Sequence, residues 1–169
     1  MKKKAIWTII LLLIMSSVGA VGERNIVGFW KTIDEKKGFI TSIMMTYMYQ
    51  GKLYGRVIVS FDEKSGEFVE SYMNPTVVAS KVKGTPLLLD IDIFYNLVLD
   101  EEKYVDGMVI DPRSGKSYHA EAWTTKEGFI LRGKFGPFGM NNLFLPANRQ
   151  DFPEGVEVPS FSSFTPYIW

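Results

Sequence analysis

The only histidine of the chain, His119, lies two residues before Glu121, so both side chains would share one face of a β-strand. A histidine beside a carboxylate can act as an acid–base pair or supply half of a metal site. One histidine and no cysteine in 169 residues exclude a multi-histidine or cysteine-ligated metal centre within one chain, and a thiol nucleophile. A solvated face beside Trp123 is the simpler interpretation of the pair. We therefore predict no catalytic residue, no metal and no cofactor.

Tyr54 and Arg56 also share a strand face, and an arginine fork can recognise a carboxylate or phosphate head group. The simpler alternative is that Arg56 pairs with an acidic side chain on the outside of the protein. Together with Tyr118 and Arg132, these two residues form the predicted ligand-binding set.

Asp90 and Asp92 are a third pair on one strand face, and their carboxylates could hold a hard cation such as Ca²⁺. Outward, solubilising carboxylates on an amphipathic strand explain them more simply. Gly115-Lys116-Ser117 resembles the end of a phosphate-binding loop, but position 110 is Ile where such a loop requires Gly. We interpret this segment as a hairpin turn.

The first 22 residues have the three parts of a secretory signal peptide. Lys2, Lys3 and Lys4 are followed by an apolar stretch from Ala5 to Met15, too short to span a bilayer, and then by small residues. We therefore expect a cleaved signal peptide at 1–22 and a periplasmic or extracellular protein that, without cysteine, is not a lipoprotein. A retained membrane anchor is the alternative.

The charge balance argues against a nucleic-acid partner. The chain has 19 basic and 19 acidic residues, and cleavage would remove three lysines, leaving 16 basic against 19 acidic. Nucleic-acid binding depends mainly on neutralising phosphates with Lys and Arg. We therefore predict no nucleic acid among the partners, while peripheral association with the cell envelope and the oligomeric state stay open.

The rest of the chain alternates short apolar runs, rich in β-branched and aromatic residues, with glycine and aspartate turns, which is typical of all-β proteins. A domain over 23–150 and a proline- and aromatic-rich tail over 151–169 are expected. The predicted strands are Ile26–Ile33, Phe39–Tyr49, Leu53–Phe61, Leu87–Leu99, Tyr104–Asp111, Lys116–Thr124, Phe129–Phe135 and Met140–Pro146.

Two features qualify this strand pattern. Leu87–Leu99 alternates apolar odd positions with polar even positions, which predicts one face in a core and one in water. Asp62–Pro86 is too long for a plain turn, and we expect either a short helix near Thr76–Lys81 or a lid over a barrel mouth.

About eight antiparallel strands in a chain of this length favour closure into a single meander barrel, whose interior is either filled or just wide enough for one small ligand. Small residues at some expected inward positions leave room for a cavity, but they equally allow large neighbours to interdigitate, and a packed interior is slightly favoured. The expected inward positions are Leu53, Gly55, Val57, Val59, Phe61, Tyr118, Ala120, Ala122, Phe129, Leu131, Gly133 and Phe135.

Several short motifs, in order and spacing, resemble a bacterial secreted family known as domain of unknown function 2147. They include Gly28-Phe29-Trp30, Lys52–Val57, Gly84–Leu88, Leu131-Arg132-Gly133 and, most specifically, Ile110–Tyr118. The resemblance spans roughly 27–146 and implies a calycin-like small β-barrel with no catalytic residues to carry over. The sequence departs from the family where Phe144-Leu145-Pro146 stands in place of a Trp-x-Arg-like strand.

Gly28 and Trp30 also resemble the opening motif of lipocalins, in which the tryptophan packs across the closed barrel end, often against a late arginine. Arg132 or Arg149 could take that role through cation–π stacking. We assign Trp30 to the core. The residues predicted to have structural roles are Gly28, Trp30, Asp111, Pro112 and Gly115.

Three function classes follow. The leading one is an exported, non-catalytic barrel that binds a small apolar or amphipathic ligand, or an envelope partner through its aromatic tail. The second is an integral eight-stranded outer-membrane barrel, for which the terminal Trp169 is suitable and Pro166 is not. The third is an enzyme whose site the sequence does not reveal.

Overall fold

The computed structural model describes residues 25–168, so the predicted signal peptide lies outside the described residues. Within this range the helical elements are two three-residue 3₁₀ turns, and no helix is long and apolar enough to cross a membrane. The elements in chain order are β1 (Gly28–Ile33), β2 (Ile40–Tyr49), β3 (Lys52–Phe61), β4 (Phe68–Ser71), η1 (Leu88–Asp90), β5 (Asp92–Asp100), β6 (Lys103–Asp111), β7 (Lys116–Thr124), β8 (Phe129–Phe135), β9 (Phe138–Pro146) and η2 (Arg149–Asp151).

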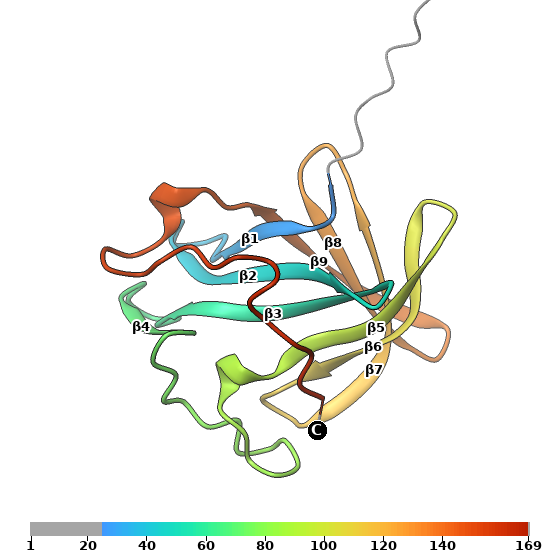
Figure 1. Cartoon of the computed structure of the whole chain (residues 1–169), viewed down its shortest axis with the longest axis horizontal. Helices are drawn as coiled ribbons and strands as arrows, with labels where there is room; N and C mark the ends of the chain where they lie inside the picture. The colour runs from blue at the N-terminus through green and yellow to red at the C-terminus, as the bar shows by residue number, and fades with distance from the viewer. Residues whose placement is uncertain (1–24, 169) are drawn as a thin grey trace, which may run out of the picture.

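The strands form an antiparallel meander that closes on itself (Figure 1). Around the barrel the order is β1, β2, β3, β5, β6, β7, β8 and β9, and β9 returns to pair with β1. The short strand β4 pairs with the end of β3 outside this ring. The predicted all-β, eight-stranded antiparallel barrel is therefore confirmed.

The two barrel ends differ, and we name them by what they contain. The closed end holds the start of β1 with Ile26 and Trp30, and the open end holds the β6–β7 and β8–β9 turns. Trp30 is 3% exposed, and its indole N–H donates to the carbonyl of Ile26 at 3.2 Å and to Thr46 Oγ1 at 2.9 Å. These bonds satisfy the indole N–H, so the ring can be buried across the closed end.

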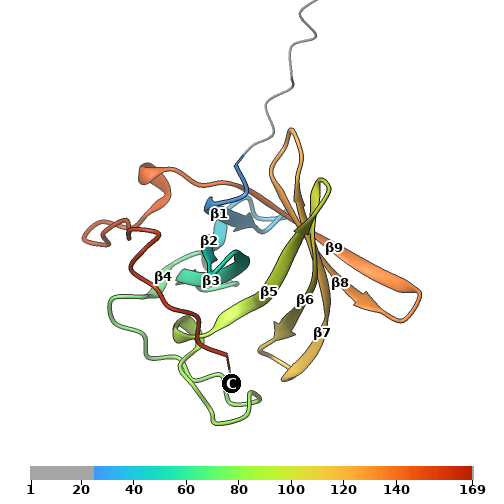
Figure 2. The ribbon, with the colours of Figure 1, turned by 45° about the vertical axis from the view of Figure 1, so that its right-hand side comes forward.

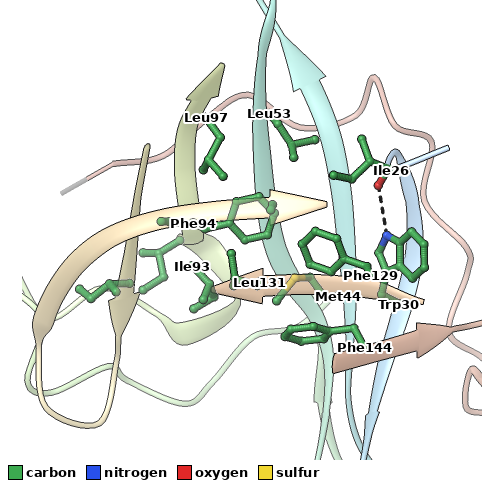
Figure 3. Close-up of a cluster of buried hydrophobic side chains, with 14 of the residues drawn as sticks. Ile26, Trp30, Met44, Leu53, Ile93, Phe94, Leu97, Phe129, Leu131 and Phe144 are labelled. Atoms are coloured by element: carbon green, nitrogen blue, oxygen red, sulfur yellow. Dashed lines mark hydrogen bonds between the residues drawn. The ribbon is translucent and has the colours of Figure 1, made fainter. Parts of the chain in front are cut away.

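The barrel interior is packed from the closed end through the middle (Figure 3), and Ala79 and Val82 of the segment between β4 and β5 join the same buried cluster beside Ile110. Phe129 lies at the centre, with ring centroids 5.5 Å from Trp30, 5.7 Å from Phe94 and 5.4 Å from Phe144. A Cβ on Gly55 would overlap the Phe94 ring. The small residue at this position therefore makes room for a large neighbour rather than for a cavity, as the packed interpretation predicted.

The segment between β3 and β5 is more ordered than a plain loop. It contains β4, and a bridge between Val78 and Leu87 holds its two halves together. The helix expected near Thr76–Lys81 is wrong, because backbone bonds such as Ala79 N–H to the Pro86 carbonyl run across the segment. The alternative, a cover over the barrel mouth, agrees better with the structure, since Ala79 and Val82 are buried in the interior cluster with Ile110. Glu70 is 3% exposed, and its Oε2 accepts hydrogen bonds from the backbone N–H groups of Thr76 and Val77.

The Leu87–Leu99 segment does not form the single alternating strand predicted from its pattern. It begins with η1, and β5 contains an irregularity near Ile93 and a left-handed residue, Asn96, with φ of 62°. These irregularities change which face each side chain occupies. Leu99, expected in the core, is 56% exposed, and Asp92, expected in water, is fully buried.

A second apolar cluster lies on the outside of the barrel, over β2 and β3. The tail after η2 crosses this wall and ends beside β5 (Figure 1). Phe152 and Val156 of the tail are buried there against Ile43 and Ile58. A bulge opposite Ile43 and Met44 also sends Val59 to this outer cluster, which contradicts the expected inward position. Phe61 packs against the same cluster, contrary to the same expectation.

Candidate functional site

The predicted ligand residues Tyr54 and Arg56 lie on the barrel's outer wall, beneath the tail. Arg56 Nη2 donates to Asp92 Oδ2 at 2.9 Å and to the carbonyl of Thr165 at 3.1 Å. Tyr54 donates from its hydroxyl to Asn96 Oδ1 at 2.8 Å. The simpler alternative for Arg56, an acidic partner, is thus what the structure contains, although that partner is buried and not outward.

Asp92 is the centre of this network. Its carboxylate accepts from Arg56, from the Tyr47 hydroxyl at 2.7 Å and from the backbone N–H of Tyr167 at 2.8 Å. Burial raises the pKa of Asp92 above its ordinary value, and Arg56 and the other donors offset part of that effect. Burial and the nearby Asp92 carboxylate raise the pKa of Tyr47 as well. The network therefore joins the barrel wall to the tail.

The other two predicted ligand residues lie elsewhere and apart. Tyr118 is opposite Val109, which is opposite Phe94, so its side chain shares their inward face. Its ring centroid is 4.2 Å from that of Phe135. Arg132 lies on the outer face of β8, where Nη1 donates to Asn141 Oδ1 at 3.2 Å. Of the four predicted ligand residues, only Tyr54 and Arg56 are close together.

The residues predicted to have structural roles lie in two places, the closed end of the barrel and the β6–β7 turn. The Gly28 N–H donates to Thr46 Oγ1 at 3.0 Å, beside Trp30. Asp111 folds the Asp111-Pro112 turn, where its side chain accepts from the Arg113 N–H at 3.0 Å and from the Ser114 hydroxyl at 2.7 Å.

Gly115 completes this turn with φ of 71°, and a Cβ there would clash with the Lys81 carbonyl. The turn therefore packs closely against the long segment between β4 and β5. Among residues 25–168, neither Arg132 nor Arg149 makes the expected cation–π contact with Trp30. Arg132 points outward, and the Trp30 ring packs against Phe129.

His119 and Glu121 line a shallow groove of about 310 Å³ on the outer face of β6, β7 and β8. Lys134 forms an ion pair with Glu121 in this groove, and Asp106 and Val105 also contribute. Among residues 25–168, no group of three or more His, Cys, Asp or Glu side chains could hold a metal ion. The Glu121 carboxylate in this groove is therefore paired with Lys134.

The open end has a different character, because β1 pairs with β9 only at Trp30–Pro146 and Lys31–Leu145. Beyond these pairs the β8–β9 hairpin extends away from the rest of the barrel (Figure 2). Phe138 and Met140 share the inward face with Phe144, yet they are 75% and 62% exposed. The inner wall of the barrel is therefore apolar and uncovered at this hairpin.

A side-chain cluster, which we call the hairpin patch, consists of Tyr118, Phe135, Phe138 and Met140. Phe135 is 45% exposed. Gly133, also in β8, has no side chain to fill the inner face beside it, and the nearest side chain to its Cβ position is Val109. Large exposed apolar patches on a soluble domain commonly mark ligand or partner sites. The hairpin patch is the strongest candidate site in the part of the chain that the structure describes.

Comparison with protein-family models assigns this barrel to a family. Residues 28–144 match the family model described as an uncharacterized protein conserved in bacteria, DUF2147. The chain belongs to the DUF2147 family. This assignment confirms the resemblance drawn from the sequence motifs, and no curated protein matches the chain.

Among solved structures, this DUF2147 protein is similar to protein HP1028 from Helicobacter pylori, described as belonging to the lipocalin family. The TM-score is 0.55 at 12% sequence identity, over 75% of this chain and 86% of that one. At this identity the likeness supports the barrel fold alone, and it confirms the lipocalin-like architecture.

Sequence reasoning missed both the buried Asp92 network and the hairpin patch of this DUF2147 protein. Asp92 looked like an outward carboxylate because its partners come from β2, β3 and the tail, far away in sequence. A signal for the hairpin was present, since no charged residue occurs between Lys134 and Arg149. Such a run is unusual for a strand with this much exposure.

Proposed function

We propose that this protein is an exported, non-catalytic binding protein that takes a small apolar or amphipathic molecule at the open end of its barrel. The observation that carries the proposal is the exposure of Phe138 and Met140 on the inward face of β9. These side chains lie where a lipocalin-like barrel opens, and barrels of eight strands are able to hold one small ligand.

The location within the barrel follows from the packing. Phe94, Phe129 and Phe144 fill the interior towards the closed end, so a ligand there would have to displace buried rings. At the open end, Phe138 and Met140 lose no packing when a ligand arrives, and covering them removes apolar surface from water. The ligand is therefore expected to sit against the hairpin patch, above the packed core and not within it.

The polar groups beside the patch favour an amphipathic molecule. Asn142 is opposite the inward-facing Leu131, so its amide lies on the inner face, and Tyr118 brings a hydroxyl to the same wall. Both groups are neutral hydrogen-bonding partners. An apolar chain with an uncharged polar head fits this combination better than a strongly ionic ligand.

Docking of an envelope partner by the tail, which was part of the leading hypothesis, and the alternative of an outer-membrane barrel receive less support. Tail rings that would dock an envelope partner pack on the protein's own barrel, where Phe152 is 6% exposed and Phe161 stacks on Phe29 at 4.9 Å. A transmembrane barrel combines a polar interior with an apolar outer band. Here the interior is aromatic, and the outer wall carries ion pairs such as Lys31–Asp151.

Export rests on the sequence of the first 22 residues alone, and peripheral envelope association is compatible with it. N-terminal sequencing of the protein recovered from the cell-envelope and soluble fractions of its host tests both points. A new N-terminus after residue 20 or 22 supports export. An intact Met1 in the cytoplasmic fraction contradicts it.

Native mass spectrometry and organic extraction of the protein, purified from its host without detergent, test the binding function. We expect a bound small molecule, and we expect Met140→Ser to weaken rebinding of that molecule about tenfold or more, because one buried apolar side chain contributes about 1.5–3 kcal/mol. Leu99→Ser is the matched control, since Leu99 is 56% exposed at the closed end.

If the mass is clean, a fluorescent fatty-acid analogue replaces the unknown molecule. Saturable binding that Met140→Ser weakens and Leu99→Ser leaves unchanged supports the proposal. A clean mass together with no saturable binding of the analogue would overturn it.

A further inference from the structure

The β9 strand has an unpaired edge at the open end. The ladder with β1 stops at Lys31–Leu145, so the preceding part of β9 pairs only with β8. Phe138 is opposite Phe135 across the two-residue turn, so these two residues form a hydrogen-bonded pair. Successive residues of an antiparallel strand direct their backbone groups to opposite sides. Gly139, Asn141 and Leu143 therefore direct their backbone N–H and C=O groups away from β8.

This edge has none of the features that usually protect a strand edge. Natural edges are protected by charges, prolines, bulges or a covering segment. Every residue from Phe138 to Leu143 is exposed, and the register with β8 is regular along the hairpin. The charge-free run from 135 to 148 includes the whole edge. Arg132 bonds to Asn141 from the outer face and leaves the backbone edge uncovered.

We infer that this edge pairs with the same edge of a second copy of the chain, so that β9 and its copy form a continuous antiparallel sheet about a two-fold axis. A pair centred on Asn141 uses all three outward-bonding residues of each copy. It places Asn141 opposite its own copy and Leu143 opposite the Gly139 of the partner copy. Closed two-fold dimers of this kind are the commonest oligomers of soluble proteins.

The side chains at the edge fit this register. Gly139 has no side chain of its own, and the Arg132 guanidinium lies where its Cβ would be. Leu143 of one copy would therefore pack on the flat guanidinium of the partner copy's Arg132 and meet no side chain from Gly139. On the outer face, Trp123, Ile130 and Leu143 are directly opposite one another across β7, β8 and β9. This apolar row would reach the new interface.

Charge favours a second copy over an unrelated strand. Like charges opposite each other destabilise strand pairs, and two copies of an uncharged strand avoid this cost. The strand residues that would face a partner, Gly139, Asn141 and Leu143, are uncharged, and the nearby Arg132 guanidinium already donates to Asn141 of its own copy. Asn141 opposite its copy supplies a neutral amide pair, which can both donate and accept. The inference is independent of ligand binding, since it uses the strand edge and not its inner face.

The mass in solution tests the inference. Sedimentation velocity of the exported protein, loaded at about 1–100 μM, is expected to give twice the mass of one chain at the higher concentrations. Asn141→Asp keeps the size and shape of the side chain and still accepts from Arg132 within one copy. In the dimer, however, it places two carboxylates opposite each other. We expect it to raise the dissociation constant tenfold or more.

Asn142→Asp is the matched control, because it adds the same charge to the same strand on the inner face, away from the two-fold axis. It should weaken the dimer a few-fold at most. A wild-type protein with the mass of one chain throughout the range contradicts the inference. So does an Asn141→Asp variant that dimerises as tightly as the wild type.

A cross-linking experiment locates the interface even if a charge variant is poorly folded. The chain has no cysteine, so Asn141→Cys introduces a single thiol. Opposed Cα atoms about 5.5 Å apart are within the range that a disulfide spans. Mild oxidation should link Asn141→Cys copies and leave Leu99→Cys copies unlinked. Equal linking of the two variants would show that collisions, and not the edge, bring the thiols together.

Discussion

Arg56 and Asp92 form an ion pair of 2.9 Å inside the protein, between the outer wall of the barrel and the C-terminal tail. Their side chains are 8% and 0% exposed. Tyr47 and the backbone of Tyr167 complete the set of donors to the carboxylate, while Thr165 accepts from the guanidinium. The tail thus supplies two of the hydrogen bonds of this buried cluster, while Arg56 Nε is buried without a partner.

The first prediction concerns this pair. Asp92→Ala leaves the Arg56 guanidinium buried without its carboxylate, and we expect the free energy of unfolding to fall by about 3–5 kcal/mol. The double variant Arg56→Met, Asp92→Leu removes both charges and should lose less than Asp92→Ala alone. Urea unfolding at pH 7 measures both. A double variant that is the less stable of the two would contradict the importance of the unpaired charge.

The tail gives a second prediction. Phe164 lies with its ring centroid 5.6 Å from Tyr72 and 5.2 Å from the Arg56 guanidinium carbon. Phe164→Ala should therefore cost about 2 kcal/mol of stability, less than for a fully buried ring. Ser163→Ala, at an exposed neighbouring position, is the control and should change little. Equal stability of the two variants would show that the tail contributes little to the fold.

The strand and turn plan of this barrel was predictable because its signals are local. Lys116–Thr124 and Phe129–Phe135 have the bounds expected from the sequence, and the Asp111 turn forms from its own side-chain hydrogen bonds. Apolar alternation and turn residues depend on neighbours a few positions apart. The family motifs lie in the same segments.

The faces of β3 and β5 were not predictable in the same way. Irregularities near Ile58 and Ile93, with the left-handed Asn96, change which side chains point inward. A bulge depends on the register with a partner strand, which is not visible in one strand's own pattern. Asp92 was placed in water for the same reason, because its burial depends on a tail 75 residues further on.

The third prediction tests how tightly the barrel interior is packed. A methyl group at Gly55 would overlap the Phe94 ring, which is itself fully buried against Phe129. Gly55→Ala should therefore destabilise the protein by about 1–3 kcal/mol, since the ring has little room to move. Adding Phe94→Leu to Gly55→Ala should recover part of the loss. Thermal and urea unfolding of the single and double variants measure this coupling, and simple additivity would contradict a direct clash.

The last prediction is an alkaline loss of stability that involves Tyr47. Burial, and then the Asp92 carboxylate, raise the pKa of Tyr47 above its ordinary value of 10.0. The unfolded chain releases this proton at a lower pH than the folded protein does, so the contribution is fully present below pH 10 and falls as the pH rises beyond it. The slope for one proton is about 1.4 kcal/mol per pH unit.

Burial raises the pKa values of Tyr54 and Tyr72 as well, so several tyrosines contribute to the alkaline slope. Tyr47→Phe should lower stability at pH 8 by about 1–2 kcal/mol, because the hydrogen bond to Asp92 is lost. Its stability should then decline less steeply than that of the wild type between pH 10 and 11.5. Urea unfolding at half-unit pH steps compares the two slopes. Parallel slopes would mean that Tyr47 ionises equally readily in the folded and unfolded chain, and that the Asp92 network does not hold its proton.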